Sequence, residues 1–125
     1  METTRFPIRF TGPNHAMRLV GLTSGNSWVE VGDGRLRVRM GWAFRADVPL
    51  ESVRDPRLDD RRVWAWGAHG WAGRWLVNGS SSGIVCMDLE PPDFAKLGPV
   101  LVTLRELRVS VEDPRGLVAA LATRR

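Results

Sequence analysis

The stretch from Trp28 to Met40 constrains the fold of this chain more than any other. At its centre, Asp33 and Gly34 supply the two positive-φ residues that a tight hairpin turn requires. With the turn there, one face pairs apolar residues, and the other pairs a carboxylate or an indole with arginine. The expected cross-strand pairs are Val31 with Leu36, Val29 with Val38, Glu30 with Arg37, and Trp28 with Arg39. One register satisfies both faces, so the stretch predicts two antiparallel strands with one dry face and one charged face.

Length and composition bound the class of protein. A chain of 125 residues with 43% hydrophobic residues fits one globular domain. Cys86 is the only cysteine, which excludes an internal disulfide and a multi-cysteine zinc site. No apolar run approaches the roughly 20 residues of a membrane span, and residues 1–7 lack the basic and apolar parts of a signal peptide. We therefore expect a cytoplasmic protein.

The net charge of +4 comes almost wholly from arginine, and Lys96 is the only lysine. The arginines are scattered along the chain rather than collected in one basic segment. This distribution argues against a nucleic-acid-binding protein.

Further strands are expected on both sides of the central hairpin. Residues 5–10 alternate and predict an edge strand, where Pro7 is tolerated. The apolar run 17–22 fits either a strand or a helix. Another strand, which closes at residue 53, is expected to alternate, with Trp42, Phe44, Ala46 and Val48 on one face. Residues 54–62 mix both charge signs and predict a solvated loop.

In the second half, residues 63–66 could form a strand. Segments 75–77 and 84–89 flank a Gly- and Ser-rich stretch and predict a hairpin that Pro91 and Pro92 end. Both segments are apolar on both faces, so something should cover the outer one. A last strand should place Leu107, Val109 and Val111 on one face.

The chain ends in a predicted amphipathic helix over residues 113–122. Asp113 is a good N-cap and Pro114 suits the first helical position. Leu117, Val118 and Leu121 form its apolar stripe, which can close the open end of an antiparallel sheet. The sequence thus predicts a mainly β protein with one C-terminal α-helix.

This order of elements resembles the bacterial pleckstrin-homology-like (PH-like) domains. The resemblance is carried by the hairpin at 28–41, the strand end at 48–53, and the strand that runs into the helix at 107–121. The chain is also similar to small actinobacterial proteins that open with Arg-Phe-Pro-x-Arg-Phe and continue with Trp-Val-Glu-Val-Gly-Asp-Gly. The resemblance implies a β-barrel of two orthogonal antiparallel sheets with a C-terminal helix at one corner. It also implies one domain over 1–125, with an N-terminal extension to about residue 26, and self-association or a protein partner.

Two sets of side chains are candidate interaction sites. The first is a tryptophan-rich cluster that either packs over the outer sheet face or forms an exposed patch for a protein partner or an apolar ligand. Its members are Trp64, Trp66, Trp71, Arg74 and Trp75. The second is the stripe Arg35, Arg37 and Arg39, which is either a solvated strand face or a surface for an anion, an acidic partner or an anionic membrane.

The sequence offers little catalytic chemistry. His15 and His69 are isolated from each other and from other metal-ligating residues. Cys86 lies in an apolar segment, as a buried free cysteine usually does. The carboxylates Asp55, Asp59 and Asp60 are interleaved with arginines, a pattern typical of surface ion pairs. We therefore expect a non-enzymatic interaction module without a metal or cofactor. The alternatives are an apolar-ligand binder and a peripheral membrane binder.

Overall fold

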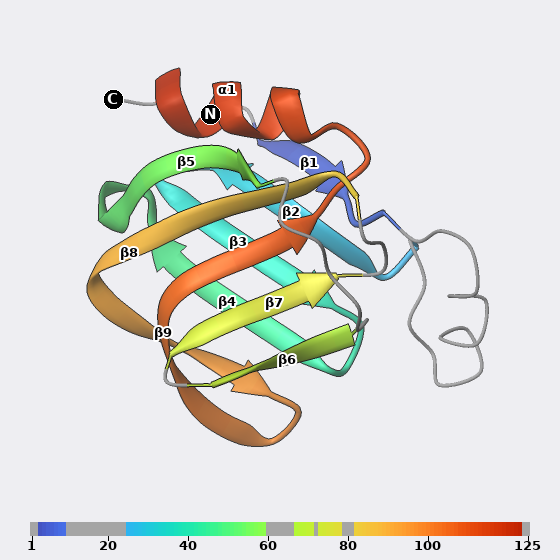
Figure 1. Ribbon diagram of the computed structural model, residues 1–125, viewed down its shortest axis with the longest axis vertical. Coiled ribbons are helices and arrows are strands. Elements are labelled where there is room, and N and C mark those ends of the chain that lie inside the picture. Colours follow the sequence, from blue (N-terminus) through green and yellow to red (C-terminus); the bar gives the residue numbers. More distant parts are fainter. Residues whose placement is uncertain (1–2, 10–24, 60–66, 72, 79–81, 124–125) are drawn as a thin grey trace.

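The computed structural model describes residues 3–9, 25–59, 67–71, 73–78 and 82–123 (Figure 1). Of residues 67–71, 78 and 123 it describes the backbone. The strands are β1 (Thr4–Pro7), β2 (Ser27–Gly32), β3 (Arg35–Met40), β4 (Phe44–Pro49), β5 (Val53–Asp59), β6 (Gly67–Trp71), β7 (Arg74–Asn78), β8 (Ile84–Leu97) and β9 (Val100–Ser110). A 3-10 turn, η2 (Leu50–Ser52), joins β4 to β5, and the helix α1 (Pro114–Thr123) ends the described chain. The expected elements at 17–22 and 63–66 lie outside the described residues.

The strands form one strongly curled sheet in the order β1-β2-β3-β4-β8-β9-β7-β6, and β5 pairs with β8 (Figure 1). The long strand β8 makes the curl possible, because its first half pairs with β5 and its second half pairs with β4. Figure 1 shows α1 across one end of the curled sheet, beside β5. The predicted fold class, a mainly β, barrel-like protein with one C-terminal helix, is confirmed.

The central hairpin has the predicted register. Val31 pairs with Leu36, Val29 with Val38, Glu30 with Arg37, and Trp28 with Arg39. Asp33 and Gly34 have φ angles of 53° and 72°, as the two-residue turn requires. Val29 and Val38 are buried. β1 ends the sheet order and pairs with β2, but the predicted edge strand has a second neighbour. Ile8 forms an antiparallel bridge with Val111, and the backbone N–H of Glu112 donates to the Pro7 carbonyl at 3.0 Å.

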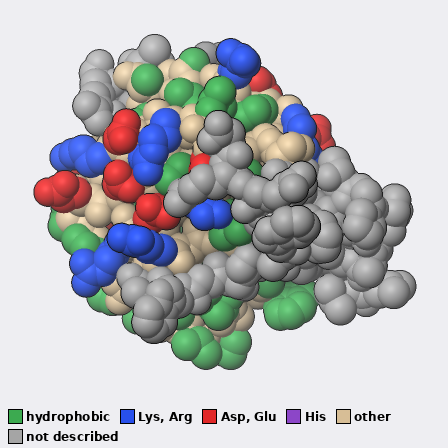
Figure 2. All heavy atoms as spheres, in the orientation of Figure 1, with side chains coloured by type: hydrophobic (Ala, Val, Ile, Leu, Met, Phe, Trp, Pro, Cys, Tyr) green, Lys and Arg blue, Asp and Glu red, His purple; other side chains and the backbone are tan. Residues whose placement is uncertain are grey.

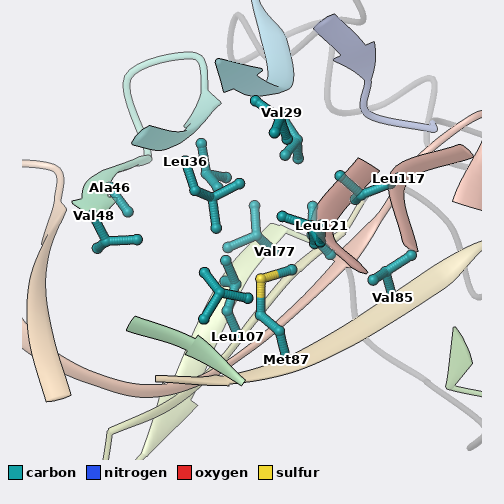
Figure 3. Close-up of a cluster of buried hydrophobic side chains, with 14 of the residues drawn as sticks. Val29, Leu36, Ala46, Val48, Val77, Val85, Met87, Leu107, Leu117 and Leu121 are labelled. Carbon is teal, nitrogen blue, oxygen red and sulfur yellow. The ribbon is translucent and has the colours of Figure 1, made fainter. Parts of the chain in front are cut away.

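The core lies inside the curl, where side chains from both halves of the sheet converge (Figure 3). Leu117 and Leu121 from α1 are fully buried in this core, so the helix closes it as predicted. The N-cap is confirmed too, because the backbone N–H of Gly116 donates to Asp113 Oδ1 at 3.0 Å. Leu107, Val109 and Val111 are all buried on the predicted face.

The predicted loop at 54–62 is wrong for the residues that the structure describes. Residues up to Asp59 form β5, which pairs with β8 through an irregularity between Arg54 and Arg57. The exposed Asp55 within it has a positive φ of 52°. A strand can carry these charges because several of the side chains remain exposed while the backbone pairs with β8. Trp42 was also wrongly placed, since it is exposed in the turn before β4.

The predicted hairpin of 75–77 with 84–89 is wrong. β9 lies between β7 and β8, parallel to the first and antiparallel to the second. The prolines at 91 and 92 do not end β8. They lie where the β8–β9 register shifts, between Asp88 and Asp93, and a shift of register accommodates residues that have no backbone N–H. Leu76 and Ile84 form a separate buried pair outside the main core, so the second apolar face is covered as expected.

Candidate anion-binding surface

The outward faces of β1 to β4 carry a row of charges that neutralise one another. Arg5, Glu30, Arg37 and Asp47 are successive cross-strand neighbours. Glu30 forms ion pairs with Arg5 Nη2 at 3.0 Å and with Arg37 Nη1 at 3.5 Å. Asp47 lies 3.6 Å from Arg37 Nε and 2.8 Å from Arg35 Nε. The predicted Glu30–Arg37 pair is therefore confirmed, and this row, which we call the paired row, has alternating charge.

A second row on the same face has a single charge sign. Arg39 on β3 lies opposite Arg45 on β4, and Arg45 lies opposite Lys96 on β8. Within the described residues, no ion pair joins these three side chains, which we call the cationic row, to a carboxylate. Arg39 has weaker partners, the Gly41 carbonyl at 3.4 Å and the Trp28 ring at 5.6 Å. Like charges directly opposite each other destabilise a sheet, so the row gains from a bound anion.

Apolar side chains flank the cationic row at both ends. Trp28 is the cross-strand neighbour of the first cation, and the exposed Leu101 is the neighbour of Lys96. Phe94, also exposed, precedes Lys96 by two residues on the same face of β8. Together with both charge rows, these side chains line a groove of about 460 Å³. That volume falls within the range of small-molecule sites.

The groove suits ligands that combine negative charge with apolar surface. Guanidinium groups bind carboxylate and phosphate oxygens with two parallel hydrogen bonds, and an ammonium adds a point charge. The indole of Trp28 already carries the Arg5 guanidinium at 4.1 Å from its ring centroid, which fixes that wall of the groove. The lining combines cations, paired carboxylates and apolar groups, a set that can bind an anion with an apolar part.

The structure divides the predicted stripe of arginines. Arg37 belongs to the paired row and Arg35 forms an ion pair with Asp47 of that row, whereas Arg39 belongs to the cationic row. Sequence reasoning missed Arg45 and Lys96. The outward position of Arg45 could be read from its alternation with buried neighbours, but its pairing with Lys96 joins distant parts of the chain.

The predicted tryptophan cluster is described only in part. Trp64 and Trp66 lie outside the described residues, and the backbone of Trp71 ends strand β6. Trp75 is half-buried against the core, its Nε1 donates to the Thr103 carbonyl at 3.1 Å, and its ring lies 6.3 Å from that of Phe44.

Arg74 is exposed. A second hollow, of about 540 Å³, is lined by Gly73, Trp75, Val102, Thr103 and Arg105. Trp75 lies between this hollow and the core, against which it packs.

The described carboxylates of β5 pair with arginines, but only Asp55 does so at the surface as predicted, because the Asp59 side chain is 6% exposed. Asp59 lies 3.1 Å from Arg108 Nε, and Asp55 lies 3.3 Å from Arg57 Nη1. Asp60 lies outside the described residues. Burial lowers the pKa of the Arg57 guanidinium, but the charges of Cys86 and of Asp88 and Asp55 raise it, and its pKa is raised overall. Cys86 is buried on β8.

Two features are absent from the described part of the chain. No group of three or more His, Cys, Asp or Glu side chains there could hold a metal ion. His15 lies outside this part, and of His69 only the backbone, on β6, is described. None of the helical segments in the described residues has the length and apolar character that crossing a bilayer requires.

Comparisons with protein-family models, with curated proteins and with solved structures find no match to this chain.

Proposed function

We propose that this protein is a non-enzymatic, PH-like interaction module that binds acidic groups of its partner through the cationic row. The observation that carries the proposal is the register of Arg39, Arg45 and Lys96 on three adjacent strands. Three neighbouring cations without a carboxylate partner in the described residues contrast with the paired row beside them, where each charge is matched. The antiparallel β1–β4 order and the C-terminal helix support the PH-like part of the proposal.

Binding by this surface needs little rearrangement. The cations project from paired strands, so their backbone is already fixed before the partner arrives. A bound carboxylate or phosphate relieves the repulsion between them. Trp28, Phe94 and Leu101 give apolar contact to whatever carries the anion. We expect such an interaction to weaken steeply with salt, because exposed charges are screened within about 10 Å at 0.1 M ionic strength.

The test uses inorganic phosphate as the probe. In a titration followed by ¹⁵N NMR, phosphate should shift the backbone signals of Arg39, Arg45 and Lys96 more than equal ionic strength of chloride does. The double variant Arg45→Gln/Lys96→Gln should lose these shifts. A matched control, Arg105→Gln/Arg115→Gln, removes the same charge from exposed positions on β9 and α1 and should keep them. Equal shifts in all three proteins would contradict the proposal.

A further inference from the structure

The two ends of the cationic row differ in how far their charges are already engaged. At one end, Arg39 lies near the Trp28 ring and the Gly41 carbonyl. At the other end, Arg45 and Lys96 are direct cross-strand neighbours. No side-chain hydrogen bond or ion pair joins either of these two cations to another residue of the described chain. An anion therefore meets the least competition at the end formed by Arg45 and Lys96.

Two exposed apolar side chains adjoin this end of the row. Phe94 (57% exposed) precedes Lys96 by two residues on the same face of β8, about 7 Å away along the strand. Leu101 (60% exposed) is the cross-strand neighbour of Lys96 on β9. Because Phe94 pairs with Thr103, it is a diagonal neighbour of Leu101, so one apolar group can contact both. Figure 2 shows hydrophobic side chains at the lower end of the molecule, where Figure 1 places the β8–β9 hairpin.

Carboxylates lie beside the cationic row, in the paired row. Asp47 follows Arg45 by two residues on the same face of β4, and Glu30 has the equivalent position after Trp28 on β2. Both carboxylates line the groove together with the cations. A ligand with several negative charges comes close to them when it extends past the cationic row, and like charges repel. A ligand with one terminal negative charge can lie between Arg45 and Lys96 and avoid this repulsion.

The groove is longer than a single small anion. It runs from Trp28 on β2 to Leu101 on β9, across four strand-to-strand intervals, which corresponds to about 19 Å. An extended peptide covers that length with about six residues. The shape therefore favours a peptide over a compact anion.

We propose that this end of the groove binds the C-terminal residue of a partner protein, with an aromatic or branched apolar side chain. We call Arg45, Lys96, Phe94 and Leu101 the anchor site. The inference rests on the proposed function, and it names the acidic group of the partner. The α-carboxylate accepts two parallel hydrogen bonds from the Arg45 guanidinium and another from the Lys96 ammonium.

The rest of the C-terminal residue fits the surroundings of these cations. It carries its carboxylate and its side chain on one carbon atom, as suits cations and apolar groups that are direct or diagonal neighbours. Its side chain contacts Phe94 and Leu101. The preceding residues of the partner lie along the groove toward Trp28.

The experiment compares synthetic peptides by ¹⁵N NMR titration, followed at the backbone signals of Arg45 and Lys96. The first probe is acetyl-Gly-Ser-Gly-Ser-Phe with a free C-terminal carboxylate. The same peptide with a C-terminal amide should bind at least about tenfold more weakly, because the charge-assisted hydrogen bonds are lost. The free acid that ends in glycine instead should also bind at least about tenfold more weakly, because no ring is removed from water.

Two double variants assign each preference to its side chains. Arg45→Gln/Lys96→Gln should bind the free acid and the amide equally. Phe94→Ala/Leu101→Ala should bind the peptides that end in phenylalanine and in glycine equally, while phosphate still shifts the signals of its cationic row. Melting curves check that each variant is folded, and Phe94→Ala alone replaces the apolar double variant if that one does not fold.

The matched controls lie on other parts of the molecule. Leu58→Ala changes an exposed leucine on β5, and Arg105→Gln/Arg115→Gln removes two exposed charges from β9 and α1. Both controls should keep the preference for the free acid and the preference for phenylalanine.

Asp47→Asn tests the limit on ligand charge. It should raise the affinity for tripolyphosphate, relative to that for the phenylalanine peptide, at least about threefold, because Asp47 no longer repels the additional charges. Asp88→Asn removes a similarly exposed carboxylate that also pairs with an arginine, and it should leave this ratio unchanged.

The outcomes separate this inference from the proposed function. Equal binding of the free acid and the amide by the parent overturns the inference, as does a preference for phenylalanine that survives the apolar substitutions. Tighter binding of tripolyphosphate than of the peptide also overturns it and makes the partner a polyanion. If phosphate still shifts the signals of the cationic row in these cases, the proposed function stands without the C-terminal ligand. If phosphate shifts none of them, both proposals fail.

Discussion

Lys96, the only lysine of the chain, lies opposite an arginine on the neighbouring strand. A cross-strand pair of like charges destabilises a sheet. We therefore expect Lys96→Gln to raise the free energy of unfolding by about 0.5 kcal/mol at low ionic strength while weakening phosphate binding. Urea unfolding at low and high salt measures the first effect. Arg115→Gln is the control, and a Lys96→Gln protein less stable than the parent would contradict the expectation.

A second prediction at the scale of single residues concerns the start of α1. The Asp113 carboxylate accepts the backbone N–H of Gly116 at 3.0 Å. Asp113→Ala should therefore lower the free energy of unfolding by about 1 kcal/mol, as measured by urea denaturation. Asp113→Asn keeps an oxygen acceptor and should lose much less. Equal losses in the two variants would show that the cap is not the cause.

At the scale of elements, α1 stabilises the fold mainly by closing the core. Leu117 and Leu121 are fully buried in the main core, and α1 packs against β5 and β8. Leu121→Ala leaves a cavity and should cost about 2–5 kcal/mol, whereas Ala119→Ser on the exposed side of the helix should cost well under 1 kcal/mol. Thermal and chemical denaturation measure both. If Leu121→Ala lowered the free energy of unfolding only slightly, the core would have relaxed to fill the cavity, contrary to this prediction.

How far the elements could be predicted depended on the distance between their partners in the sequence. The register of β2 and β3 follows from Asp33, Gly34 and the alternation around them, because a two-residue turn leaves one pairing that buries the valines. The place of β9 between β7 and β8 does not follow from any local pattern. Segments 75–77 and 84–89 have the pattern of a hairpin. The strand that separates them, β9, comes later in the chain, so no nearby residue indicates it.

Only part of the candidate site could be predicted, again because some of its residues are far apart in the sequence. The alternation along β3 puts Arg39 on the outer face beside Trp28, and the central hairpin fixes that neighbourhood. Arg45 and Lys96 come together through the pairing of β4 with β8, which joins residues far apart in the chain. The sequence therefore indicates an arginine stripe but does not separate its paired members from its unpaired one.

At the scale of the whole molecule, anions should stabilise the folded state. A ligand that binds the native protein alone raises its stability according to its concentration relative to Kd. Phosphate should therefore raise Tm above the value in chloride of equal ionic strength. Because phosphate also stabilises proteins through exclusion from their surfaces, the relevant quantity is the part of the increase that Arg45→Gln/Lys96→Gln abolishes. An equal increase in the parent and this variant would leave no role for the row.

The position of β9 also sets the order in which the chain can acquire its shape. Arg74 pairs with Glu106 and Val77 with Val109, so β7 can join the sheet only after residues far downstream exist. During synthesis, earlier segments emerge first. Until β9 is made, the edge of β7 that will pair with it has no hydrogen-bonding partner. Non-local pairing of this kind slows folding. A chain that ends before residue 100 would therefore leave the β9-facing edges of β7 and β8 unpaired. Unpaired strand edges are sites of aggregation.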